Sequence, residues 1–139
     1  MKKTILALFL ATIAGYGMAK DKQQVTVSLT SASTMAQGMA MVLANQMQEQ
    51  GAQVDILLCD KAGDIALKGA KGEALKPNNV TPAQLLDGAI KKGATASVCA
   101  LYLPNTGHKA EDLRDGIKPA NPAAMAASLL EKNRKHIGF

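Results

Sequence analysis

Residues 25–59, VTVSLTSASTMAQGMAMVLANQMQEQGAQVDILLC, place a strand, a helix and a second strand in succession. Residues 25–31 alternate and are rich in β-branched side chains, which is typical of a strand. Residues 54–59 are a short apolar run bounded by polar residues, which predicts a buried strand. A strand–helix–strand unit of this kind is right-handed, and it predicts a parallel sheet with both faces covered.

The helix of this unit is expected over residues 35–50, which contain no proline. Ser33 or Thr34 comes just before it and can accept a hydrogen bond from the free backbone N–H groups of the first turn. Gly51 comes just after it and can end the helix in the left-handed conformation. The helix therefore has both a start signal and a stop signal.

Methionine occupies many of the apolar positions in this helix. Met39, Leu43 and Met47 recur every four residues and predict an apolar stripe that faces the core. The helix methionines Met35, Met39, Met41 and Met47 also allow an alternative, a thioether copper site in an exported protein. Because methionine packs readily in cores, we favour the core interpretation and expect no metal site.

Strands and helices continue to alternate beyond this unit. The expected elements are a helix that begins at Thr81-Pro82 and ends at Gly93, a strand at 94–103, a helix from Asn121-Pro122 to about residue 132 and a strand at 135–139. This alternation predicts a three-layer α/β sandwich around a mainly parallel sheet of four to five strands.

The first nineteen residues have the layout of a secretory signal peptide. Two lysines give a cationic start, residues 5–16 are apolar, and residues 17–19 form the cleavage site. The apolar run is shorter than the roughly 20 residues that span a bilayer, so cleavage is favoured over a membrane anchor. We expect one domain at residues 20–139, exported to the periplasm and not anchored in the membrane.

The composition excludes several classes of protein. The chain has 139 residues, 47% of them hydrophobic, and a net charge of +5, which fits a single folded domain. Beyond the signal segment the aromatic residues are Tyr102 and Phe139, so the stacking platforms of a nucleic-acid binder are missing. The sequence has no phosphate-binding loop and no G-x-S-x-G motif, and we expect no cofactor.

Cys99 is the sharpest candidate for chemistry. It lies near the carboxyl end of a predicted central strand, where open α/β sheets bind their ligands. A short helical turn after it would favour the thiolate, although free cysteine is more often a small buried side chain. Cys59 ends the preceding strand in the same way. If the two strands are neighbours, the cysteines are within reach of a disulfide, and if another strand separates them they are not.

Weaker candidates lie beside these cysteines in the predicted fold. Ser31, Ser33 and Thr34 could hold an anion at the start of the first helix, although helix capping explains them equally well. His108 could act on Cys99 if its loop folds back.

The ordered set of motifs resembles the DsrE/DsrF-like family of small sulfur-relay proteins. The likeness rests on VDILLC at 54–59, on SVCALYLPNTG at 97–107, where Cys99 stands eight residues before Gly107, and on EDLRDGI at 111–117. An Ala-rich helix and a short terminal strand complete the set.

This resemblance implies a three-layer α/β/α sandwich with a parallel five-stranded sheet in the order 4-3-2-1-5. That order places Cys59 and Cys99 at one rim and raises the prospect of a disulfide or a redox pair. In sulfur-relay members the cysteine that matches Cys99 accepts a persulfide sulfur and passes it on. Members commonly form trimers or hexamers, which implies a homo-oligomer with a sulfur donor and acceptor that the sequence does not identify.

Three hypotheses follow for the function. The first is an exported persulfide carrier or thiol-redox protein that uses Cys99, with Cys59 as its partner and at most a sulfurtransferase-like activity. The second is an oligomeric binding module without chemistry, in which the cysteines are structural. The third is a metal binder that uses methionine and cysteine sulfur.

Overall fold

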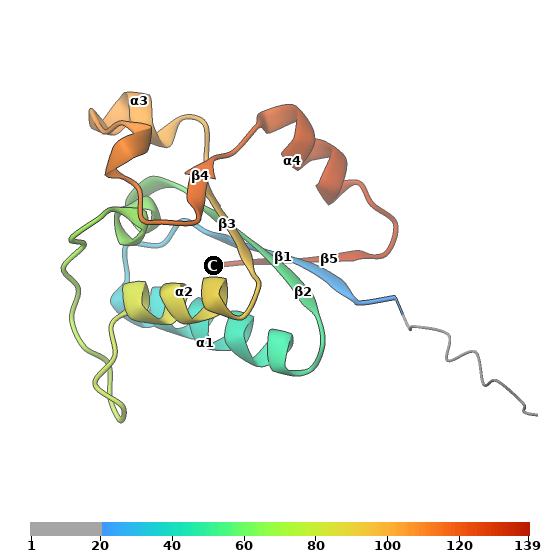
Figure 1. Ribbon diagram of the computed structural model, residues 1–139, viewed down its shortest axis with the longest axis horizontal. Coiled ribbons are helices and arrows are strands. Elements are labelled where there is room, and N and C mark those ends of the chain that lie inside the picture. The colour runs from blue at the N-terminus through green and yellow to red at the C-terminus, as the bar shows by residue number, and fades with distance from the viewer. Residues whose placement is uncertain (1–20) are drawn as a thin grey trace, which may run out of the picture.

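The computed structural model describes residues 21–139, which form one five-stranded sheet with helices packed on it (Figure 1). All four strand pairings are parallel, and the strand order is β4-β3-β2-β1-β5. The fold class and the strand order expected from the sequence are confirmed. The predicted signal peptide lies outside the described residues.

The elements follow one another along the chain with short connections, apart from the longer segment between the first 3₁₀ helix and α2. In order they are β1 (Gln24–Leu29), α1 (Thr34–Glu49), β2 (Gln53–Leu58), the 3₁₀ helix η1 (Asp60–Ala66), α2 (Pro82–Lys91), β3 (Thr95–Val98), α3 (Tyr102–Thr106), the 3₁₀ helix η2 (Ala110–Asp112), β4 (Ile117–Pro119), α4 (Pro122–Leu129) and β5 (Arg134–Gly138).

The start and stop signals of the two long helices act as expected. The Ser33 side chain accepts a hydrogen bond from the Ala36 N–H and caps α1, and Gly51 adopts a φ of 90° just after its end. Thr81 caps α2 in a reciprocal capping box with Gln84. These bonds satisfy backbone donors that a helix leaves unpaired, so the helices begin where the sequence predicts.

The main core lies between the sheet and the pair α1 and α2, which cover the same face (Figure 1). Val27, Ile56 and Val98 on the central strands are buried there. Every second residue of these strands faces the opposite side, because side chains alternate along a strand. The parallel register therefore stacks apolar residues of neighbouring strands on this one face.

The opposite face of the sheet is polar and only partly covered. Arg134 donates hydrogen bonds to Asp55 and, over 3.2 Å, to the buried hydroxyl of Thr26. Burial tends to lower the pKa of Arg134, but its bonds to Asp55 and Glu131 outweigh this and raise it. The helix on this side, α4, has no buried residue. This second face is covered by α4 without a tightly packed apolar core, since it carries ion pairs and hydroxyl groups that tolerate water.

The predicted stripe of Met39, Leu43 and Met47 on α1 is confirmed only in part, since Met47 packs against the core while Met39 is exposed. Met41 is fully buried, whereas Met35 and Met39 are 72% and 54% exposed. The helix instead packs through its small residues, because Ala40 and Ala44 are fully buried against the core. Since α1 carries apolar residues around most of its circumference, the spacing of the larger ones did not identify the buried face.

This orientation of α1 predicts different outcomes for two methionine substitutions. Met41→Ala should lower the free energy of unfolding by about 3 kcal/mol, because it leaves a cavity in a packed core. Met39→Ala is the matched control and should change it by less than about 0.5 kcal/mol, because this side chain is exposed. Guanidinium unfolding measures both values, and equal losses would contradict the orientation.

The strand predicted at 94–103 is shorter in the structure, since β3 ends at Val98. After Cys99 the chain turns, with a hydrogen bond from the Tyr102 N–H to the Cys99 carbonyl, and continues into α3. Tyr102 and Leu103 are buried, so they read as strand residues in the sequence. A short apolar run does not distinguish a buried strand from a buried helical turn.

Within residues 21–139, the helices are all too short or too polar to cross a bilayer.

Candidate functional site

A disulfide joins Cys59 and Cys99 at the carboxyl edge of the sheet, with 5.1 Å between their Cα atoms. Each cysteine is the residue directly after its strand. The Cys59 N–H still bonds to the Leu29 carbonyl, and the Cys99 N–H bonds to the Leu58 carbonyl. The backbone around the bridge is therefore held by the sheet on both sides.

The strand register explains why these two residues meet. β2 and β3 are parallel neighbours, and Leu58 lies opposite Val98. The next residue on each strand is a cysteine, so the two side chains leave the sheet at the same level. This adjacency answers the question that the sequence left open, whether a strand separates them.

The disulfide opens onto a cavity of about 480 Å³, which we call the disulfide cavity. Both cysteines line it, together with charged residues of η1 and with residues of the segment that follows β3. Leu101 on that segment is 70% exposed. Because the bridge lines an open cavity instead of lying sealed in the core, a small molecule can approach its sulfur atoms.

Tyr102 supports the floor of this cavity. Its hydroxyl donates a 2.6 Å hydrogen bond to Asp64, and its ring lies so close to Gly63 that a Cβ atom there would collide with it. Burial, followed by the hydrogen bond and charge of Asp64, raises the pKa of Tyr102 far above its ordinary value. The phenol therefore stays protonated and holds α3 against η1.

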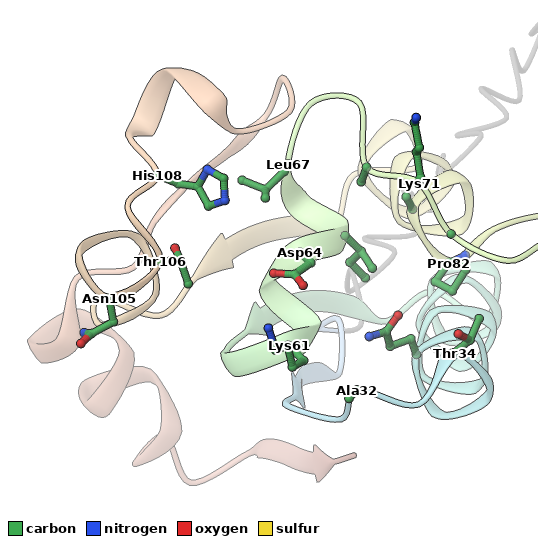
Figure 2. Close-up of a pocket in the computed structure, with 15 residues that line it drawn as sticks. Ala32, Thr34, Lys61, Asp64, Leu67, Lys71, Pro82, Asn105, Thr106 and His108 are labelled. Atoms are coloured by element: carbon green, nitrogen blue, oxygen red, sulfur yellow. The ribbon is translucent and has the colours of Figure 1, made fainter.

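A larger cavity of about 740 Å³, the helix-end cavity, lies next to the first. The two share four lining residues, namely Lys61, Asp64, Asn105 and Thr106. Figure 2 shows them around η1, with Asn105, Thr106 and His108 on one side and Thr34 and Pro82 on the other. Thr34 and Pro82 are the first residues of α1 and α2, so two helix N-termini border this cavity.

Two of the four predicted ligand-binding residues line this larger cavity, and the other two do not. Thr34 and His108 line it, whereas Ser33 is used as the α1 cap and Ser31 accepts a hydrogen bond from the Ser33 N–H. His108 stacks on Tyr102 with 6.4 Å between ring centroids and contacts Asp112 over 3.6 Å. His108 is not among the residues that line the disulfide cavity with Cys99.

Lys61, Asp64 and Tyr102 are site residues that the sequence analysis did not select. Lys61 and Asp64 lie in residues 60–79, a glycine-containing stretch for which the sequence predicts a loop with a short helical turn, and nothing in their spacing marks them as neighbours of a cysteine. Tyr102 is one of two aromatic residues beyond residue 20, and this rarity is the sequence feature that could have marked it as a site residue.

Metal ligands do not gather in the described part of the chain. In residues 21–139, no three side chains of His, Cys, Asp or Glu form a group that could hold a metal ion. The methionines of α1 do not line up as ligands on a single face of the helix either, because Met41 is buried while Met35 and Met39 are exposed. Both cysteines are used in the disulfide.

Comparison with known proteins identifies the fold. No family model and no curated protein matches the sequence. The structure is similar to that of the YchN protein from E. coli, with a TM-score of 0.69 and 18% identity over 84% of this chain and 99% of that one. It is also similar to MTH1491 from Methanobacterium thermoautotrophicum, described as a protein of unknown function, with a TM-score of 0.63 and 8% identity over 85% of this chain and all of that one. These likenesses show a DsrE/YchN-like fold, and identities this low show nothing beyond the fold.

Proposed function

We propose that this chain is an exported sulfur-handling protein in which Cys59 and Cys99 form a redox-active pair and the reduced Cys99 accepts sulfane sulfur. The observation that carries the proposal is the bridge between two neighbouring strand ends, open to a cavity. Thiol–disulfide exchange needs access to a sulfur atom and a leaving thiolate, and a strand edge provides access.

The chemistry begins with the bridge. A small thiolate attacks Sγ of Cys99, the S–S bond breaks, and its electron pair leaves on Sγ of Cys59. A second thiolate then attacks the mixed disulfide and releases Cys99, so two thiols are oxidised to a disulfide while the pair is reduced.

The reduced pair can then accept sulfur. The Cys99 thiolate attacks the outer sulfur of a persulfide R–S–SH, which forms Cys99–S–SH and releases the thiolate of the donor. The Cys59 thiolate next attacks Sγ of Cys99, which restores the disulfide and releases HS⁻. The sulfane sulfur gains the two electrons that the pair loses, so the cycle balances with the small thiol as reductant.

Export and assembly complete the proposal. The signal-type segment at 1–19 and the disulfide both fit an oxidising compartment such as the periplasm. A trimer or hexamer of identical chains would cover apolar side chains that are exposed in one chain, such as Met35 and Leu130. Light scattering on the purified mature protein would measure this assembly.

Intact mass spectrometry tests the proposed function on the folded protein. After mild reduction by a small thiol, we expect the native chain to gain two hydrogen atoms and to become alkylated on both cysteines. Incubation of the reduced protein with a low-molecular-weight persulfide should then add about 32 Da, the mass of one sulfur atom, at Cys99 only transiently, and should release sulfide and return the chain to the mass of its disulfide form.

The unfolded protein is the control for these measurements. If the bridge is reduced only after unfolding in denaturant, and the reduced native chain takes up no sulfur, the cysteines are structural and the chain is a binding module. A bridge that is reduced at similar rates in the native and unfolded states supports the exchange function.

A further inference from the structure

The helix-end cavity has no assigned role in the exchange reaction, yet it adjoins the disulfide cavity. Its volume of about 740 Å³ is in the range of small-molecule sites. It shares residues of η1 and α3 with the disulfide cavity, so one extended molecule can occupy both.

The two cavities differ in charge. The disulfide cavity is bordered by Asp60 and Asp64 against a single lysine, Lys61. The helix-end cavity keeps Asp64 and Lys61 and adds a second lysine, Lys71. A negative charge is therefore disfavoured near the sulfur atoms and favoured on the far side of η1.

Lys61 is the cation that both cavities share. In the structure of residues 21–139 it forms no ion pair with an acidic side chain, whereas the Asp64 carboxylate accepts the Tyr102 hydroxyl. Figure 2 shows Lys61 on η1 beside Asp64, while the Lys71 side chain extends away from η1. The α1 and α2 N-termini add partial positive charge at the opposite wall.

We infer that the small thiol or persulfide used by this protein carries a carboxylate at a distance from its sulfur, and that Lys61 binds this carboxylate in the helix-end cavity. The sulfur of the ligand then reaches Cys99 through the disulfide cavity. This inference rests on the proposed exchange function and adds the class of its substrate.

Reduction kinetics with a matched pair of thiols test the inference. Glutathione carries two carboxylates remote from its thiol, and its diethyl ester keeps the same thiol without these negative charges. On the native protein, we expect the second-order rate constant for glutathione to exceed that for the diester by roughly fivefold, the effect of one lysine charge at contact distance in a solvated site. This ratio should fall toward one in high salt.

Two variants locate the effect. Lys61→Gln should bring the ratio of the two rate constants to about one. Lys22→Gln makes the same change in net charge at an exposed residue before β1, at the opposite edge of the sheet, and should keep the ratio.

The outcomes separate the inference from the function on which it rests. Equal rates for both thiols on the native protein, or a ratio that survives Lys61→Gln, would overturn the carboxylate site and leave the exchange function intact. If neither thiol reduces the native bridge, the exchange function fails and the inference fails with it.

Discussion

Cys99→Ser should abolish the uptake of sulfur, whereas Cys59→Ser should trap it. With persulfide as donor, the reduced Cys99→Ser chain is expected to lose at least about 100-fold in the rate of uptake, because the attacking thiolate is gone. In Cys59→Ser the persulfide forms on Cys99 but no second thiol resolves it. That variant should accumulate the added sulfur atom and release no sulfide.

Quantification of protein persulfide by intact mass and of sulfide in solution checks this division of roles. Both single variants lack the bridge, so they are matched in the loss of the cross-link and differ in the thiol that remains. An inverted pattern, with sulfur retained on Cys59 in Cys99→Ser, would assign the acceptor role to the other cysteine. The absence of uptake in both variants and in the reduced native chain would leave the pair a structural bridge.

The second large expected effect is on stability. The bridge closes a loop between residues 40 positions apart, and the chain-entropy model assigns about 4 kcal/mol of stabilisation to a loop of that length. Reduction should therefore lower the free energy of unfolding by up to that amount. Guanidinium unfolding of the native protein, with and without reductant, measures the difference.

The Cys59→Ala, Cys99→Ala double variant is the control, because reductant should not change its unfolding. An unchanged midpoint on reduction of the native chain would contradict the estimate. The same free energy also makes the bridge harder to reduce in the folded chain than in the unfolded chain.

Much of the fold was predictable because its signals are local. Ser33, Gly51 and Thr81 act on backbone groups within a few residues, so the limits of α1 and α2 follow from the sequence. The orientation of α1 does not follow in this way. Met39 and Met41 are similar in chemistry, and only the approach of Ala40 and Ala44 to the core determines which methionine is buried.

The candidate site was predictable in part for the same reason. The sequence shows a cysteine directly after each of two apolar runs. Whether the two cysteines meet depends on the strand order, and only the family resemblance predicted that order. The cavity residues Lys61 and Asp64 could not be found, since their place beside Cys99 depends on the fold of η1 against α3. That packing requires the absence of a side chain at Gly63, which a sequence alone does not connect to Tyr102.

The parallel pairing of β5 with β1 has a practical consequence for anything attached to this protein. β1 enters the sheet at the edge away from the cysteines, while β5 leaves it at the edge where they lie. A label or fusion joined to Phe139 would emerge on the reactive side and compete with approaching molecules. One joined ahead of Gln24 would emerge on the far side, so a tether placed there leaves the sulfur atoms open to solution.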